Sequence, residues 1–291
     1  MDNLIENVKW TEKTEKLDEL IRQGVSLHAM NQGFEAEVVK VSSAAGEHFV
    51  LKRWNKSSRP DVGFQFRLLN ALLERGVSVA RPLGWGFDES GAQAMLTSFD
   101  GAPVGRLNKR KVIDIAKLLS SLHRIPMDEL AHLPLPAYDF ADYFFPGVKE
   151  KEHEDIREAV HALVRQVEIK QDRVIHGDFH LANLLEEEDG RLTVIDWTNG
   201  QAGDASYDFA WSYILMSIYV SEGHADTFRT AYLSSNNDIR QHELDVFEAL
   251  ACLRWMLLQR NGGVPLGPDT MAKVNRLATN NPHLHALELA K

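Results

Sequence analysis

Residues 174–197 read VIHGDFHLANLLEEEDGRLTVIDW and contain two short apolar runs on either side of Asp189 and Gly190. An Asp-Gly pair between apolar runs is a strong signal for a β-hairpin, because both residues tolerate the backbone conformation of a tight turn. Pairing outward from a two-residue turn at Asp189 and Gly190 places Asn183 opposite Asp196. The sequence therefore predicts a hairpin in which these two polar side chains face each other.

The residue types in this pair indicate a metal site. Directly opposed residues on antiparallel strands point to the same face, with Cβ atoms roughly 5 Å apart. The amide oxygen of Asn183 and the carboxylate of Asp196 are the hard ligands that Mg²⁺ prefers, and this ion takes further ligands from water and phosphates. We therefore predict Asn183 and Asp196 as Mg²⁺ ligands. The alternative is that they are the polar ends of a hairpin.

Asp178 precedes the hairpin and is the predicted catalytic base. Gly177 beside it permits a tight loop that holds the carboxylate in place. Phosphoryl transfer needs a group that orients the attacking hydroxyl, while a metal and cations neutralise the phosphates. Two alternatives remain for Asp178. It caps a turn, or it forms a zinc or iron site of a metallohydrolase with His176 and His180.

The composition excludes several classes of protein. The chain has 291 residues, enough for about two domains, and its 44% hydrophobic and 25% charged residues are ordinary globular usage. The net charge of −10 opposes broad contact with nucleic acid or an anionic membrane. Residues 1–20 lack the apolar core of a signal peptide, and the apolar run Phe209–Val220 is too short to span a bilayer. We expect a cytoplasmic protein without a nucleic-acid or membrane partner.

Two lobes are predicted, because the pattern of the sequence changes near residue 100. Before it lie four short strand-like runs: Glu37–Val41, Glu47–Trp54, Arg81–Gly86 and Ala92–Phe99. After it, apolar residues recur at helical spacing over long stretches, with residues 174–197 as the exception. We predict a small N-terminal lobe over residues 1–99, built on an antiparallel sheet with one helix, and a larger, mostly helical lobe over residues 100–291.

The run from His176 to Asn183, followed by Ile195-Asp196-Trp197, resembles the catalytic loop and metal-binding segment of kinase-like phosphotransferases. The resemblance is closer to the aminoglycoside phosphotransferase and choline kinase family, whose pattern continues as G-D-x-x-x-D-[LIF]-A. Residues 203–210 read GDASYDFA. Protein kinases usually carry arginine where this chain has Gly177, which argues against a protein substrate. The resemblance spans Gly24 to Tyr232 and implies an α+β, bilobal, protein-kinase-like fold with ATP between the lobes.

The same resemblance assigns further residues to the nucleotide. These positions are Lys52, Gly33, Gln65, Thr97, Ser98 and Phe99. Lys52 would hold the α and β phosphates, Gly33 would belong to a reduced phosphate loop, and the backbone of residues 97–99 would contact adenine. The implied activity is transfer of the γ-phosphate of ATP, with Mg²⁺, to a hydroxyl of a small molecule. Aminoglycosides, choline, amino alcohols and sugars all remain open as acceptors.

Gln65 departs from the family pattern, because it stands where a glutamate normally pairs with the phosphate lysine. Its carbonyl accepts a hydrogen bond but brings no charge, so a pair with Lys52 would be weaker. This departure keeps a second hypothesis open, a nucleotide-binding pseudokinase or regulatory module without turnover.

Several conspicuous residues after the hairpin are expected to be structural. Asp204 and Asp208 precede or begin an apolar helix, where helix capping and bracing of a loop are favoured over metal binding. The aromatic residues of this region have the spacing of a core rather than of a cage for a quaternary ammonium group. They are Trp197, Tyr207, Trp211 and Tyr213.

Overall fold

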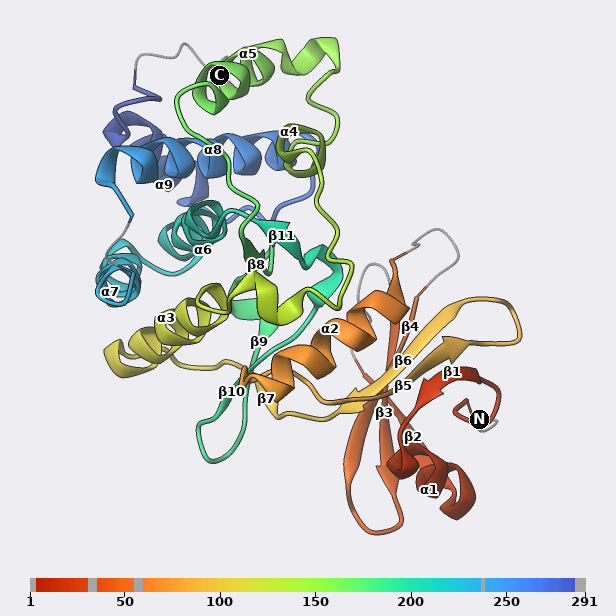
Figure 1. The fold of residues 1–291 in the computed structure, drawn as a ribbon. Helices are drawn as coiled ribbons and strands as arrows, with labels where there is room; N and C mark the ends of the chain where they lie inside the picture. Colours follow the sequence, from red (N-terminus) through yellow and green to blue (C-terminus); the bar gives the residue numbers. More distant parts are fainter. Residues whose placement is uncertain (1–3, 31–35, 55–59, 237–238, 286–291) are drawn as a thin grey trace. The chain divides into compact units, whose positions relative to one another are not determined.

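The computed structural model describes residues 4–30, 36–54, 60–236 and 239–285 (Figure 1). The chain divides into two compact units. The first comprises residues 1–105 and 184–198, and the second comprises residues 106–183 and 199–291. The division based on sequence places the whole of residues 100–291 in the second lobe. In the structure, residues 184–198 have their contacts within the first unit.

A six-stranded antiparallel sheet forms most of the first unit. Its strands, in sheet order, are β1 (Lys9–Lys13), β5 (Pro82–Phe87), β6 (Gln93–Ser98), β4 (His48–Trp54), β3 (Ala36–Ser43) and β2 (Val25–Ala29). The four strand-like runs of the sequence correspond to β3, β4, β5 and β6, which confirms the predicted antiparallel sheet. Alternate residues of β3 and β4 are buried, because one face of these strands packs into a core with Leu17 and Leu20.

Two helices accompany this sheet, so the prediction of one helix in this lobe is wrong. Helix α1 (Glu15–Gln23) begins at Thr14, whose hydroxyl accepts from the backbone of Leu17 and caps the helix. Helix α2 (Val62–Glu74) follows β4 and contacts β5 and β6. Asp61 caps its first turn by accepting from Phe64 N. The chain leaves α2 through Gly76, whose φ of 75° is the left-handed conformation that favours glycine at a helix end.

The predicted hairpin exists, but its register differs from the prediction by one residue. It consists of β9 (Leu184–Glu186) and β10 (Leu192–Val194), and β7 (Ala102–Pro103) pairs with β9 on its other side. The paired residues run from Leu184↔Val194 to Leu192↔Glu186. The prediction that Asn183 lies opposite Asp196 is therefore wrong, because both residues lie outside this ladder.

The turn explains the error. Glu187 and Arg191 are joined by a backbone hydrogen bond, so three residues rather than two form the loop. Gly190 takes the left-handed position with φ 86°, and the Asp189 carboxylate accepts from Arg191 N at 2.9 Å. A three-residue loop with a left-handed glycine is a common alternative to the two-residue turn. The Asp189-Gly190 pair therefore predicted the presence of the hairpin correctly, but the predicted length of its loop was wrong.

The second unit is mostly helical. Its helices are α3 (Lys109–His123), α4 (Phe140–Phe144), α5 (Glu154–Val164), α6 (Ala205–Tyr219), α7 (Glu222–Leu233), α8 (Gln241–Arg260) and α9 (Thr270–Asn280). Short 3-10 turns lie at Met127–Leu130, Lys151–His153 and Leu181–Asn183. A fourth, Trp197–Asn199, crosses from the first unit into the second. Two short strands, β8 (Arg173–Ile175) and β11 (Gln201–Gly203), pair antiparallel.

Helices α6 and α8 lie at the centre of this unit's core. Both are buried over most of their length, and their apolar side chains belong to one cluster with residues of α4 and α5. Tyr207 and Trp211 are members of this cluster and Tyr213 packs against it, which confirms the predicted structural role of these aromatic residues. Asp204 accepts from Ser206 N at 2.8 Å, so the predicted helix cap is also confirmed.

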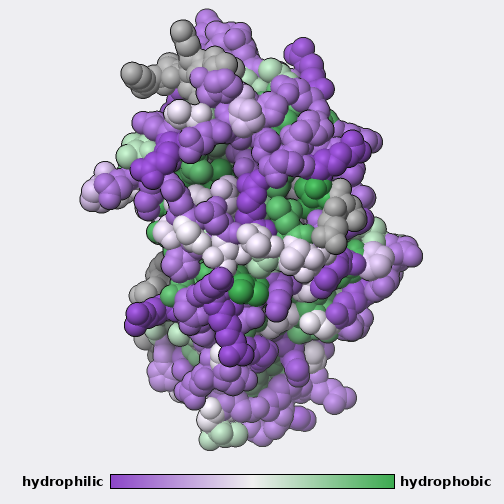
Figure 2. Space-filling view, turned by 90° about the vertical axis from the view of Figure 1, so that its left-hand side faces the viewer, coloured by the Kyte–Doolittle hydropathy of each residue, from purple (hydrophilic) through white to green (hydrophobic). Residues whose placement is uncertain are grey.

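Hydrophilic residues dominate the face of the molecule in Figure 2, and hydrophobic ones occur there in small separate areas. Within the described ranges, the structure contains no helix that combines the length and the apolar character needed to cross a bilayer.

An ion pair between Arg229 of α7 and Glu248 of α8 lies at the border of the core. Glu248 is buried, and this burial raises the pKa of its carboxyl group to about 7 although Arg229 acts in the opposite direction. A carboxyl group whose pKa is raised by folding stabilises the native state at low pH, and this stabilisation is lost as the pH rises through the folded pKa.

Gly86→Ala should destabilise the protein. A Cβ atom at residue 86 of β5 would lie 2.2 Å from the carbonyl oxygen of Lys9 in β1, so the two strands would have to separate locally. We expect a loss of roughly 1–3 kcal/mol, the usual cost of forcing an extra methyl group into a packed site. Denaturant unfolding measures this loss. Gly105→Ala is the matched control, because no heavy atom lies within 4 Å of its Cβ position. Equal stability of the two variants would contradict the proposed contact.

Glu248→Gln should reduce the pH dependence of stability. In the wild-type protein the unfolded state ionises at Glu248 near the ordinary pKa of 4.5, whereas the native state ionises only near pH 7, so this contribution to stability is lost as the pH rises from 4.5 to about 7. The variant has no such group. The melting temperature of the variant should therefore fall less over this interval. Glu158→Gln on the exposed side of α5 serves as the control and should follow the wild type. Parallel profiles for wild type and Glu248→Gln would show that burial does not raise this pKa.

Candidate active site

The loop from His176 to Asn183 follows β8 in the second unit and carries Asp178. Gly177 has a φ of 77°, and a Cβ atom there would lie 2.8 Å from the carbonyl oxygen of Asn199. Only glycine avoids both the left-handed strain and the clash. The predicted need for glycine in a tight loop is confirmed.

Asp208 of α6 fixes the start of this loop. Its Oδ2 atom accepts from His176 N at 2.8 Å and lies 3.0 Å from His123 Nε2, and its Oδ1 atom accepts from Gly177 N at 2.9 Å. Tyr232 Oη lies 2.6 Å from His123 Nδ1 and extends the network. Burial alone would raise the pKa of Asp208, but His123 and the backbone N–H of His176 lower it below its ordinary value. The predicted bracing role of Asp208 is confirmed.

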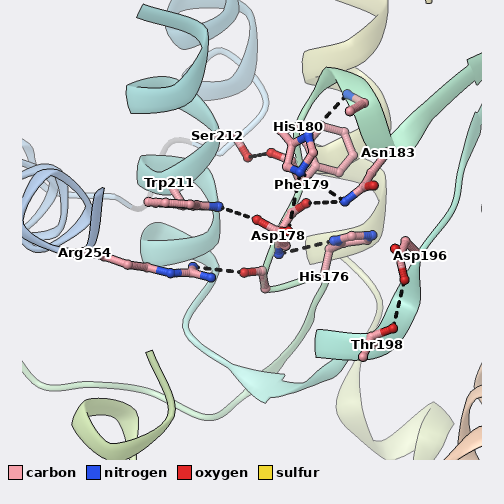
Figure 3. Close-up of polar contacts among 12 residues, drawn as sticks. His176, Asp178, Phe179, His180, Asn183, Asp196, Thr198, Trp211, Ser212 and Arg254 are labelled. Atoms are coloured by element: carbon pink, nitrogen blue, oxygen red, sulfur yellow. Dashed lines mark hydrogen bonds and ion pairs between the residues drawn. The ribbon is translucent and has the colours of Figure 1, made fainter. Parts of the chain in front are cut away.

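The carboxylate of Asp178 is held by two side chains (Figure 3). Its Oδ1 atom accepts from Trp211 Nε1 at 2.8 Å, and its Oδ2 atom lies 3.4 Å from His180 Nε2. Burial alone would raise the pKa of Asp178. The contact with His180, the charge of Arg254 and the Trp211 hydrogen bond outweigh this effect and hold the pKa well below its usual range. Asp178 is therefore ionised at neutral pH.

The two histidines of the loop use their Nδ1 atoms for the backbone. Asp178 N donates to His176 Nδ1 and Ala182 N donates to His180 Nδ1, both at 3.2 Å. In the part of the chain that the structure describes, their ligand atoms and those of Asp178 do not form a group close enough to hold a metal ion. This arrangement does not support the metallohydrolase alternative.

Asn183 ends the loop with a fixed amide orientation. Its Nδ2 atom donates to the backbone oxygen of Asp178 at 3.0 Å and lies 3.3 Å from His180 Nε2 (Figure 3). With Nδ2 directed to the loop, Oδ1 is the atom that Asn183 offers to a cation. The amide therefore suits a hard metal ion although the predicted hairpin register is wrong.

The first unit contains Lys52 and Asp196. Lys52 Nζ lies 3.0 Å from Asp196 Oδ1, which also accepts from Thr198 Oγ1 at 2.8 Å. Asp196 has a φ of 62° and is, among the residues described, the one non-glycine residue with a positive φ. Backbone strain of this kind occurs mostly at functional sites. Lys52 also lies 4.9 Å from the centre of the Trp54 ring.

Gln65 does not replace the expected glutamate as a partner of Lys52. Gln65 is a buried residue of α2. The structure describes both Gln65 and Lys52, and no hydrogen bond joins them. In this structure Lys52 pairs with Asp196 instead. Gly33 lies outside the described residues.

The segment Thr97-Ser98-Phe99 ends β6 and continues beyond it. Thr97 is paired with Val50 of β4, the strand that carries Lys52. The N–H groups of Ser98 and Phe99 donate to the backbone oxygens of Arg81 and His48. The carbonyl oxygen of Ser98 accepts from Thr97 Oγ1 at 3.2 Å.

Two residues near Asp178 were not assigned to the site from the sequence. Trp211 was interpreted only as a core residue, and Arg254 of α8 was not singled out. The guanidinium carbon of Arg254 lies 4.0 Å from the centre of the Trp211 ring, and its Nη1 atom donates to Gly177 O at 3.1 Å. The one signal for Arg254 was its position as a single cation within the apolar run ACLRWMLL (251–258).

Comparisons with known proteins give the fold and the family. A comparison with curated protein sequences found no match. Among solved structures, the choline kinase LicA from Streptococcus pneumoniae has a TM-score of 0.62 and 17% identity, over 90% of this chain and 95% of that one. The amicoumacin kinase hAmiN has a TM-score of 0.65 and 14% identity, over 88% and 86%. An ethanolamine kinase from Plasmodium vivax has a TM-score of 0.58 and 13% identity, over 92% and 86%.

These likenesses confirm the predicted α+β, kinase-like fold. The model of the phosphotransferase enzyme family matches residues 26–244, well over half of the chain, and confirms the resemblance on which the sequence interpretation rested. The chain therefore belongs to the phosphotransferase enzyme family.

Proposed function

We propose that this protein is an ATP- and Mg²⁺-dependent phosphotransferase that moves the γ-phosphate to a hydroxyl group of a small molecule. The observation that carries the proposal is the ionised carboxylate of Asp178, held by Trp211 and His180 on a loop that Asp208 fixes. The amicoumacin kinase was solved with AMP-PNP, Ca²⁺ and its substrate, which supports a nucleotide and a divalent cation as ligands.

Asp178 would orient the acceptor hydroxyl. Because its pKa is held low, the carboxylate is always available as a hydrogen-bond acceptor but is a weak base toward an alcohol. The proton would therefore pass to Asp178 only as the new O–P bond forms and the hydroxyl becomes acidic. This sequence of events agrees with the loose transition state of phosphoryl transfer.

Asn183 and Asp196 would hold Mg²⁺, and Lys52 would contact the non-transferred phosphates. An amide oxygen and a carboxylate fit this ion, and the direction of the Asn183 amide leaves Oδ1 to face it. The bound ion would neutralise charge on the phosphates. Lys52 stands 3.0 Å from Asp196, so the cation that we assign to the phosphates is already held beside a proposed metal ligand.

The remaining nucleotide contacts are proposed from the family resemblance. Residues 97–99 would contact adenine, and Gly33 would approach the phosphates. Gln65 would leave Lys52 without a second anionic partner, which should lower nucleotide affinity rather than abolish transfer.

The acceptor class can be determined with purified protein, ATP and Mg²⁺. The panel should include aminoglycosides, choline, ethanolamine, other amino alcohols and sugars, and ADP release should be measured above the acceptor-free rate. Release that depends on one acceptor would support the proposal. Nucleotide binding without release for any acceptor would favour the pseudokinase alternative.

Asp178→Asn should separate catalysis from binding. The variant keeps the size of the side chain and loses its charge, so turnover should fall by about 10²–10⁴-fold while nucleotide affinity stays within about twofold. Steady-state ADP release and calorimetric titration with a non-hydrolysable ATP analogue measure the two quantities. Asp172→Asn, at an exposed position before β8, is the control and should behave as wild type. Unchanged turnover in Asp178→Asn would exclude the proposed role.

Asp196→Ala should abolish Mg²⁺-dependent nucleotide binding, because it removes the proposed anionic metal ligand. Titration with the ATP analogue in the presence and in the absence of Mg²⁺ tests this expectation. The wild-type protein should bind more tightly with the metal, and the variant should show no such difference. Asp114→Ala on the exposed side of α3 is the matched control. A metal effect of wild-type size in Asp196→Ala would remove Asp196 from the metal site.

A further inference from the structure

We infer that Arg254 is a positioning residue for Asp178 and acts on it through Trp211 and the backbone of Gly177. This inference rests on the proposed function, in which Asp178 receives the acceptor hydroxyl. Arg254 comes from α8, 76 positions after Asp178 in the chain.

The contacts reach Asp178 from two directions (Figure 3). On the side-chain route, the guanidinium lies 4.0 Å from the centre of the Trp211 ring, and Trp211 Nε1 donates to Asp178 Oδ1 at 2.8 Å. On the backbone route, Arg254 Nη1 donates at 3.1 Å to the oxygen of Gly177, the residue before Asp178. One guanidinium thus restrains both the carboxylate and the peptide that carries it.

The physical effect of each contact is to reduce the freedom of Asp178. A cation over an aromatic face is attracted by the ring's quadrupole, so it fixes the plane of the indole. It also draws electron density from the ring, which strengthens the indole N–H as a donor to the carboxylate. The contact with Gly177 O holds the peptide in the left-handed conformation that starts the loop.

The shape of arginine suits this position better than that of lysine. The planar guanidinium stacks on a ring and donates from its edge at the same time, and an ammonium group cannot do both. Arg254 also lies 4.9 Å from the centre of the Phe144 ring, so aromatic groups surround it on more than one side. An apolar side chain would fill this place without the cost of desolvating a charge. We therefore attribute the charge to its contacts with the catalytic loop.

The first test compares the turnover of Arg254→Met and Arg254→Lys. Arg254→Met should lower kcat about tenfold or more, because small displacements of a catalytic group are costly, and nucleotide KM should stay within about twofold. Arg254→Lys should recover part of kcat. A residue that only fills space would show the reverse order, with methionine better tolerated than lysine. Arg276→Met, which removes an exposed arginine paired with Glu222, is the matched control.

A double-mutant cycle distinguishes positioning from general destabilisation. In an Asp178→Asn background, Arg254→Met should have little further effect on the residual rate, because the group that it positions has already been changed. A full tenfold loss in that background would overturn the inference. A change confined to the KM of the acceptor would overturn it as well, because it would make Arg254 an acceptor contact.

A second measurement does not require turnover. The indole N–H signals of the six tryptophans can be resolved by ¹H–¹⁵N NMR, and Trp211→Phe identifies the signal of Trp211. Asp178→Asn and Arg254→Met should both shift that signal, and Arg276→Met should not. If no acceptor supports ADP release, the proposed function fails while this measurement still tests the coupling. A Trp211 signal that is unchanged in Arg254→Met would refute the inference even if the enzyme is active.

Discussion

The buried carboxylate of Asp208 is the interaction on which the candidate active site depends. It accepts from two consecutive backbone N–H groups at the start of the catalytic loop and lies within hydrogen-bond distance of His123. A buried carboxylate that loses its hydrogen-bond partners raises the free energy of the protein. Movement of the loop away from Asp208 is therefore strongly disfavoured. The network joins α3, α6 and α7 to the loop, because Tyr232 contacts His123. The conformation that presents Asp178 is therefore a property of the whole helical unit.

In the proposed function, the surroundings of Asp178 favour orientation of the acceptor over strong basicity. Trp211 donates to one carboxylate oxygen, His180 Nε2 lies 3.4 Å from the other, and the charge of Arg254 adds to their effect on the pKa of Asp178. A low pKa keeps the charge in place across the physiological range, at the expense of proton affinity. Phosphoryl transfer tolerates this arrangement, because most of its barrier is lowered by positioning and by charges on the phosphates. In the proposed reaction, the same two side chains would limit the directions from which an acceptor hydroxyl could approach Asp178.

Local signals predicted much of the fold and of the loop. Four of the six strands of the sheet, the cap at Asp204, the bracing by Asp208 and the glycine at 177 follow from short-range spacing and turn chemistry, whereas β1 and β2 were not predicted. The predicted register of the hairpin was wrong because the loop has three residues, in which the Asp189 side chain accepts a hydrogen bond from Arg191 N. Arg254 was missed because its contacts are made across dozens of residues, and nothing in its local pattern specifies them. The spacing of residues in the sequence thus predicts local geometry better than contacts between residues that are far apart in the chain.

The first unit is formed by two separate segments of the chain, and this arrangement affects the order in which it can fold. Its two parts, residues 1–105 and 184–198, are separated by a long segment that belongs to the other unit. During synthesis, the two residues of β7 therefore emerge well before β9, their antiparallel neighbour, and lack this partner while residues 106–183 of the helical unit are being made. Closure of such a long loop is slow, so the pairing of β7 with β9 is expected to be a late step of folding. Expression at a reduced elongation rate would extend the lifetime of this incomplete intermediate.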